Sequence, residues 1–133
     1  MGLSKQVIVI RKDLNMRRGK QISQGCHGSL GGVLNLMTKT ENNGKFKYEL
    51  EFEKGSFLDD WLNGIFTKIT CVVNSEEELL ELHNKALEMN IPTILITDAG
   101  RTEFNGVPTK TCICIGPYHS EEIDKITSYL KLY

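Results

Sequence analysis

Two adjoining stretches near the N-terminus constrain the fold most. Residues 6–11 are almost all apolar and mostly β-branched, a pattern typical of a central strand that is buried on both faces. After a short basic loop, residues 17–37 have the pattern of a helix. A strand followed by a helix opens an α/β unit, and the loop between them lies at the carboxyl end of the strand. In open α/β sheets this edge usually carries the binding site.

The predicted helix at 17–37 has two distinct stripes. Lys20, Gln24 and His27 follow the i, i+4, i+7 spacing that aligns side chains along one narrow face. A second face, about 110° away, is apolar and consists of Ile22, Cys26, Leu30, Val33, Leu34 and Met37. We expect the apolar stripe to dock on the sheet while the polar stripe faces sideways into a cleft. The alternative is that the polar stripe is only a solvated edge.

Four glycines lie within the same turns, at positions 25, 28, 31 and 32. Each of them costs a helix about 1 kcal/mol relative to alanine. Their accumulation indicates that another element, or a ligand, packs very close to this helix.

The remaining chain continues the α/β pattern. Further apolar runs predict strands at 68–73, 93–97 and 110–116, and helical patterns occupy 57–66, 75–89 and 121–130. Helical crossovers join the first three main strands, which should therefore be parallel, whereas a loop alone joins the third to the fourth. We expect an α/β fold, a three-layer α/β/α sandwich with a mixed, mainly parallel four-stranded sheet.

The segment at 45–54 alternates strictly between aromatic or aliphatic residues and charged ones. This alternation is the signature of a half-buried strand. We expect it to form an extra peripheral strand or ribbon attached to the main sheet, preceded by a turn at 41–44.

Length and composition fit a single domain covering residues 1–133. No apolar run approaches the roughly 18 residues of a membrane span, and the N-terminus is too polar for a signal peptide. We therefore expect a cytoplasmic protein without membrane attachment. The four cysteines have neither disulfide-framework nor zinc-finger spacing, so we expect them to be reduced and mostly buried. No convergent cluster of His, Cys, Asp and Glu with ligand spacing occurs, so we expect a protein that works without metal or other cofactor.

Positive charge is concentrated at one end of the chain. The net charge is −1, but residues 1–40 carry seven Lys or Arg against one acid, so residues 41–133 must carry −7. Most of the positive charge lies between Arg11 and Lys20, around the start of the predicted helix. Such asymmetry indicates an anion-binding surface. A solvated basic loop is the alternative.

The loop at 98–102 follows the third strand and should lie at the same sheet edge as the polar stripe of the helix. A carboxylate at Asp98, beside a lysine and a histidine, can position or activate a water molecule. Arg101 and the basic loop can hold phosphate groups. Thr102 can form a hydrogen bond at the same place.

Two cysteine-based alternatives are disfavoured. Cys26 and His27 are adjacent in a helix, where neighbouring side chains diverge by about 100° and cannot pair as nucleophile and base. Cys112 and Cys114 share one face of a strand, but no further ligands accompany them, so core packing is favoured over a metal site.

Four motifs occur in a fixed order along the chain. They are Gly19-Lys20 with Gln24 and His27, then Thr97-Asp-Ala-Gly-Arg-Thr102, then Ile115-Gly-Pro117, then the final Tyr129-Leu-Lys-Leu-Tyr133. In these motifs the chain resembles the type 2 peptidyl-tRNA hydrolases, over residues 5–39 and 66–133. The pairing of G-K-x3-Q-x2-H with a later D-A-G-R-T is specific, whereas either motif alone would be weak.

The resemblance implies an enzyme that cleaves the ester between a peptide and the terminal ribose of tRNA, and so recycles tRNA released from stalled ribosomes. It implies one type 2 peptidyl-tRNA hydrolase domain, a four-stranded mixed sheet between helices, peptidyl-tRNA as the partner, and no metal. The candidate catalytic residues are Lys20, Gln24, His27, Asp98 and Thr102, and the candidate substrate-binding residues are Arg17, Arg18 and Arg101.

The chain departs from the family pattern in two places. Gly25-Cys26 precede the histidine where relatives commonly carry a Cys-Ser or Ala-Ser/Cys pair, and the segment at 45–54 exceeds the usual connection. The alternative function is a non-catalytic RNA-binding or adaptor module on the same scaffold. The intact set of Lys20, Asp98 and Thr102 favours the enzyme. The oligomeric state is left open, with a homodimer as one alternative.

Overall fold

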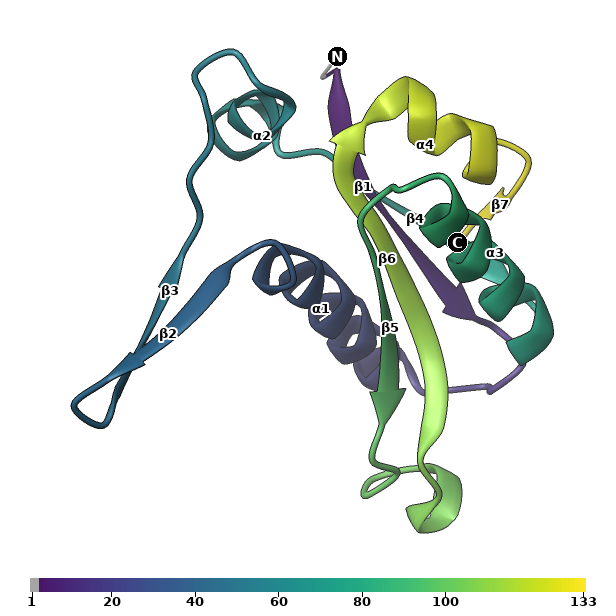
Figure 1. Cartoon of the computed structure of the whole chain (residues 1–133). Coiled ribbons are helices and arrows are strands. Elements are labelled where there is room, and N and C mark those ends of the chain that lie inside the picture. The colour runs from purple at the N-terminus through teal and green to yellow at the C-terminus, as the bar shows by residue number, and fades with distance from the viewer. Residues whose placement is uncertain (1–2) are drawn as a thin grey trace.

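The computed structural model describes residues 3–133 and is built on a mixed five-stranded sheet (Figure 1). Its strands, in spatial order, are β5 (Thr93–Asp98), β6 (Thr109–His119), β1 (Ser4–Arg11), β4 (Lys68–Val73) and β7 (Lys131–Leu132). β1 and β4 are parallel, while β6 is antiparallel to both β1 and β5. The predicted α/β architecture is therefore confirmed, and β1, β4 and β5 share one direction as expected.

The order of the strands adds a detail that the sequence pattern did not contain. β6 lies between β1 and β5 and is antiparallel to both. Of the three strands that run in the same direction, β1, β4 and β5, it is β1 and β4 that are neighbours and form a parallel pair. The physical reason is that a loop without a crossover helix lets β5 and β6 pair directly. The short fifth strand, β7, arises because the last helix ends at Thr127 rather than near Leu130, which lets the chain return to β4.

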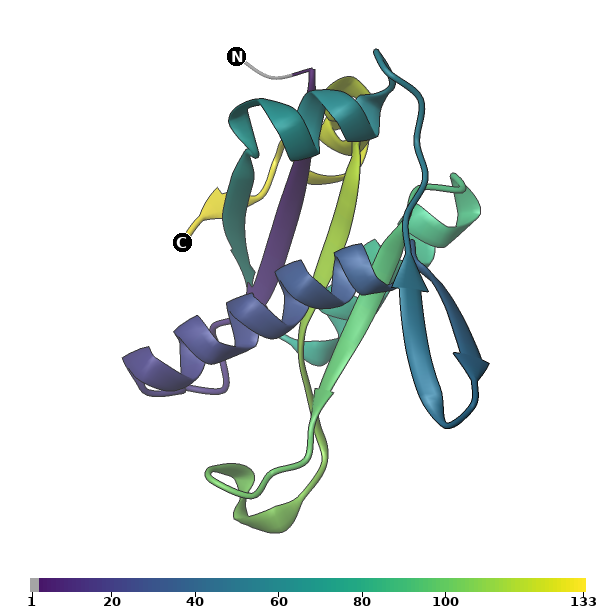
Figure 2. The same cartoon turned by 90° about the vertical axis from the view of Figure 1, so that its left-hand side faces the viewer.

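Helices cover both faces of the sheet, as the three-layer prediction required (Figure 2). α3 (Glu76–Glu88) and α4 (Ser120–Thr127) pack on one face, where Val7 and Val9 of β1 join their apolar residues in the core. α1 (Arg18–Leu34) packs on the other face over β5, β6 and β1. α2 (Phe57–Asp60) continues into one π-helical turn that buries Trp61. None of the helices described within residues 3–133 combines the length and apolar character needed to cross a bilayer.

The predicted packing of α1 is wrong, because its glycine face and not its apolar stripe lies on the sheet. Gly28 and Gly32 are buried, whereas Ile22 and Leu30 are each 62% exposed and Cys26 is also exposed. A Cβ at Gly32 would lie 3.0 Å from the Cys114 sulfur and from the Gly116 carbonyl oxygen. The expected close approach is thus real, and the glycines are what allow it. The other three cysteines are buried, as expected.

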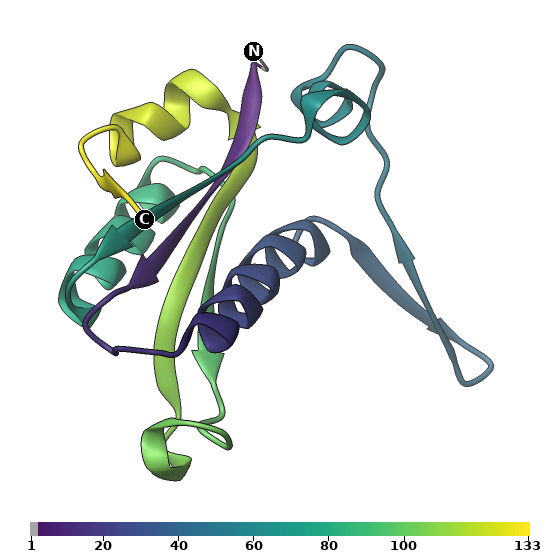
Figure 3. The same ribbon diagram turned by 180° about the vertical axis from the view of Figure 1, so that it is seen from behind.

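The segment at 45–54 does not join the main sheet. β2 (Thr38–Asn42) and β3 (Lys45–Glu49) form a separate hairpin whose ten residues are all exposed, as Figure 3 shows from behind. Asn43 and Gly44 both have positive φ, which is the geometry of a two-residue hairpin turn. The expectation of a half-buried strand on the main sheet is therefore wrong. The alternation reflects the two faces of a free ribbon, and the strand ends at Glu49 rather than at residue 54.

Two glycines of α1 give a matched stability test. Gly25 has no atom within 4 Å of an added Cβ, so Gly25→Ala should raise the free energy of unfolding by about 1 kcal/mol through helix propensity. Gly32→Ala should instead lower it by about 1–3 kcal/mol, because the added methyl group overpacks the helix–sheet contact. Urea unfolding of the two variants checks both signs. Equal effects would contradict the packing of α1 through its glycine face.

Candidate active site

The parallel directions of β1 and β5 bring two distant loops to one edge of the sheet. α1 begins just after the first loop and presents Lys20, while β5 ends at Asp98. The Lys20 Nζ lies 2.8 Å from Asp98 Oδ1 and 2.9 Å from Thr102 Oγ1. Both charged side chains are largely shielded, with 14% and 11% of their surfaces exposed. The prediction that these three residues meet is confirmed.

Asp98 is held by donors from three directions. Besides Lys20, the Gly100 N–H donates to Oδ2 at 2.8 Å and Gln24 Nε2 donates to Oδ1 at 3.1 Å. These donors lower the pKa of Asp98, with the hydrogen bond from Lys20 as the largest cause. Gly100 has φ of +81°, and a Cβ there would collide with the Val107 backbone. A glycine is therefore required at this position.

Gln24 lies behind the carboxylate rather than in the cleft. Its side chain is fully buried, and its Oε1 accepts a hydrogen bond from the buried Thr111 hydroxyl. Gln24 can therefore orient Asp98 from within the protein, whereas a substrate would not touch it directly. Thr111 was missed in the sequence, where it reads as one residue of an apolar strand. A register shift in the β5–β6 pairing leaves Thr111 without a partner on β5, which allows its side chain to reach Gln24.

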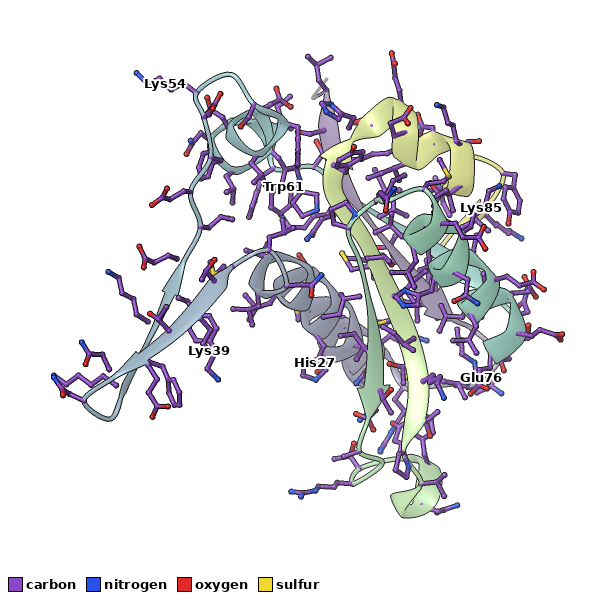
Figure 4. The ribbon with its side chains drawn as sticks, viewed as in Figure 1. His27, Lys39, Lys54, Trp61, Glu76 and Lys85 are labelled. Atoms are coloured by element: carbon purple, nitrogen blue, oxygen red, sulfur yellow. The ribbon has the colours of Figure 1, made fainter. Side chains whose placement is uncertain are left out.

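His27 lies one helical turn after Gln24 and projects from the middle of α1 (Figure 4), and it lines one pocket with the end of β5. It is exposed, and within residues 3–133 it forms neither a hydrogen bond nor an ion pair. His27 and Asp98 line the same pocket of about 550 Å³, whose other walls are mainly apolar. The histidine is thus available to a ligand that reaches Asp98.

The three predicted substrate-binding arginines surround this cluster differently. Arg17 is 82% exposed and its Nε lies 3.0 Å from Glu103 Oε1, so part of its charge is already compensated. Arg18 and Arg101 are exposed, with no ion pair in the part of the chain that the structure describes. Glu103 and the ring of Phe104, 5.8 Å from the Lys20 ammonium, complete the site and were not predicted. They lie beyond the D-A-G-R-T motif, so no motif signal points to them.

No group of three or more His, Cys, Asp or Glu within residues 3–133 lies close enough to hold a metal ion. What the site does offer is a carboxylate and an exposed imidazole in one hollow, Asp98 and His27, and an ammonium group and a hydroxyl in a second hollow, Lys20 and Thr102, joined by the contact between Lys20 and Asp98. These are the groups needed to position a water molecule and to stabilise negative charge on a reacting carbonyl.

A comparison with protein families gives this cluster its context. The family described as "Peptidyl-tRNA hydrolase PTH2" matches residues 4–133. The chain belongs to the PTH2 family. The motifs that suggested the family in the sequence are the ones that supply Lys20, Gln24, Asp98 and Thr102 to the cluster.

Curated relatives carry the same family name. A "Peptidyl-tRNA hydrolase" of Methanothermobacter thermautotrophicus is 41% identical over 128 residues, covering 96% of this chain and 98% of the relative. A "Peptidyl-tRNA hydrolase" of Methanocaldococcus jannaschii is 38% identical over 128 residues, which again cover 96% of this chain and 98% of the relative. A "Probable peptidyl-tRNA hydrolase 2" of Dictyostelium discoideum is 37% identical over 133 residues. The matched region covers the whole of this chain but only 56% of that longer protein.

The charge state of Asp98 in this PTH2 member is directly testable. Lys20→Ala removes the largest cause of the lowered pKa, so the pKa of Asp98 should rise toward its ordinary value of 3.8. A carboxylate with a lowered pKa stabilises the fold above its unfolded-state pKa and loses that contribution as pH falls. The wild type should therefore lose more stability between about pH 5 and pH 2 than Lys20→Ala. Carboxyl-carbon NMR titration and unfolding at each pH measure both effects.

Lys12 is an exposed lysine in the loop before α1. The variant Lys12→Ala is therefore the matched control for the loss of one positive charge. It should leave the titration of Asp98 unchanged. An Asp98 pKa that is the same in the wild type and in Lys20→Ala would contradict the ion pair as the dominant interaction.

Proposed function

We propose that the cluster around Lys20 and Asp98 hydrolyses the ester that joins a peptide to the terminal ribose of tRNA. The observation that carries the proposal is the 2.8 Å contact between Lys20 and Asp98, which are 78 residues apart in the chain. Membership of the PTH2 family supports peptidyl-tRNA as the substrate. The action of such an enzyme recycles tRNA released from translation, and we place it in the cytoplasm.

The proposed reaction uses water as the nucleophile. The water oxygen attacks the ester carbonyl carbon, and negative charge develops on the carbonyl oxygen. The bond from that carbon to the ribose oxygen then breaks, and the ribose oxygen takes up the proton that water releases. The products are a peptide with a free carboxyl group and a tRNA with a free ribose hydroxyl.

The electrostatics of the cluster suggest a role for each group. A carboxylate with a lowered pKa is a weak proton acceptor, so we assign Asp98 the orientation of the attacking water. The Lys20 ammonium would stabilise the oxyanion, since a fixed charge in a shielded site acts strongly. Thr102 and His27 would orient the water and the ester from opposite sides. Gln24 would hold Asp98 in place through its bond to Thr111.

The substrate's phosphate groups need positive charge outside the catalytic cluster. Arg18 and Arg101 are exposed and unpaired within residues 3–133, and Arg17 borders the hollow that also contains Lys20 and Thr102. We assign these three arginines to contacts with the RNA backbone, where guanidinium groups bind phosphate well. Residues 1–133 would then form one catalytic domain that contains both the hydrolytic site and part of its RNA contacts.

A homodimer stays an open alternative within this proposal. A groove of about 720 Å³ lies beside α1 and is lined by Ile22, Leu30, Phe66 and Tyr133, among other residues. Each of these four side chains is at least 46% exposed. Contiguous apolar surface of this kind marks interaction sites, so this groove is where two copies would meet.

Alanine substitutions test the catalytic assignment. Lys20→Ala and Asp98→Ala should each lower the turnover of peptidyl-tRNA by about 10² or more, the effect of one positioned acid–base or electrostatic group. Lys85→Ala, which removes an exposed lysine from α3 on the opposite face of the sheet, should retain normal turnover. The measurement is release of deacylated tRNA at saturating substrate, with circular dichroism to establish that each variant is folded. Folded Lys20→Ala and Asp98→Ala proteins with near-normal turnover would support the non-catalytic RNA-binding module instead.

A further inference from the structure

The β2–β3 hairpin is an arm that the proposed chemistry leaves unexplained. It projects away from the body of the protein in Figures 1 and 3, and all its residues are exposed. A two-stranded ribbon of this length is marginal on its own, because it buries little apolar surface. Even so, Phe46 is 60% exposed and Tyr48 is 51% exposed.

Both aromatic residues lie on the same face of the hairpin. The register pairs Lys39 with Tyr48 and Glu41 with Phe46, and cross-strand partners share a face. We call these four residues the aromatic face. The Lys39 Nζ lies 4.3 Å from the Phe46 ring centroid and 5.8 Å from that of Tyr48. The face therefore combines two exposed rings with one cation between them.

The arm is connected directly to the helix that carries the candidate catalytic residues. β2 begins four residues after α1 ends at Leu34. From Lys20 to Leu34, α1 spans about 21 Å at 1.5 Å per residue. Figure 4 shows Lys39 on the side of the hairpin that faces α1 and His27. A strand of RNA anchored at Lys20 and running along α1 past His27 would be directed toward this hairpin.

We propose that the aromatic face binds the unpaired 3′-terminal nucleotides of the tRNA substrate by base stacking. The proposal rests on the proposed function, since it names a second contact for the same substrate. Exposed aromatic rings beside a lysine are the elements with which proteins hold single-stranded nucleic acid. The rings stack on bases of any sequence, and the cation contacts the backbone.

Local charge is consistent with this occupant. The hairpin, residues 38–49, carries three lysines against two glutamates, and one of each, Lys39 and Glu41, lies on the aromatic face. Lys47, on the opposite face, already lies 3.6 Å from Glu49. Lys39 forms no ion pair within residues 3–133 and is therefore available to a phosphate group.

The test compares two RNA probes: deacylated tRNA, and the same tRNA trimmed of its unpaired 3′ nucleotides. Phe46→Leu combined with Tyr48→Leu keeps apolar bulk in the ribbon but removes the stacking rings. This double variant should raise the Kd for intact tRNA about tenfold or more, and should not change the Kd for the trimmed tRNA. Fluorescence anisotropy at fixed salt measures both constants.

Three further variants distinguish loss of stacking from a hairpin that has simply unfolded. Phe46→Trp combined with Tyr48→Trp keeps the stacking surface and should bind intact tRNA at least as well as the wild type. Lys39→Ala should weaken binding, whereas Lys47→Ala removes an equal charge from the opposite face and should not. Equal affinities of the wild type and the double leucine variant for intact tRNA would overturn the proposal. An equal loss on both probes would overturn it as well.

These outcomes are independent of catalysis, because deacylated tRNA carries no ester. If the wild type fails to hydrolyse peptidyl-tRNA, the proposed function falls and the binding comparison still decides the role of the arm. If hydrolysis occurs but the probes are bound equally by all hairpin variants, the arm proposal alone is wrong. A hairpin that binds another protein and not RNA would likewise leave the affinity of all hairpin variants for both RNA probes unchanged.

Discussion

The ion pair between Lys20 and Asp98 joins the two elements that form the candidate active site. It joins the first turn of α1 to the end of β5, two elements that meet only because β1 and β5 run in the same direction. Breaking one partner would leave the other charge in a largely shielded site, which is costly. The fold therefore holds both charges at one edge of the sheet, with Gln24 and Thr111 fixing the carboxylate from behind.

Close packing of α1 makes that geometry available. The helix carries glycines where a sheet-facing helix would ordinarily carry leucine or isoleucine, and this brings Gln24 within hydrogen-bonding distance of β5 and β6. The consequence is an exposed apolar stripe, with Ile22 and Leu30 on the outside of the molecule. The N-terminal half of α1 thus serves the proposed chemistry, and its C-terminal end leads into the β2–β3 arm.

Much of this could be predicted from the sequence, and the exceptions have physical reasons. Apolar runs located the four main strands. The parallel direction expected for the first and third strands predicted that Lys20, Asp98 and Thr102 meet, because strand direction follows from crossover connections. The packing face of α1 was mispredicted since hydrophobic periodicity ignores how closely a glycine face can approach a sheet. Thr111 depends on a register shift that leaves no sequence signal. The alternation at 45–54 predicts which residues share a face of a strand. It does not predict whether another element packs on that face.

We propose that Lys20 and Asp98 act as one catalytic unit, and a kinetic double-mutant cycle separates this from independent action. The turnover of peptidyl-tRNA by Lys20→Ala combined with Asp98→Ala should be little lower than that of either single variant, because residues that act as a unit lose their contribution together. The expected loss is therefore about 10² for the double variant as well. A multiplicative loss of about 10⁴, with all variants folded, would show that the two residues contribute independently and do not form one catalytic unit.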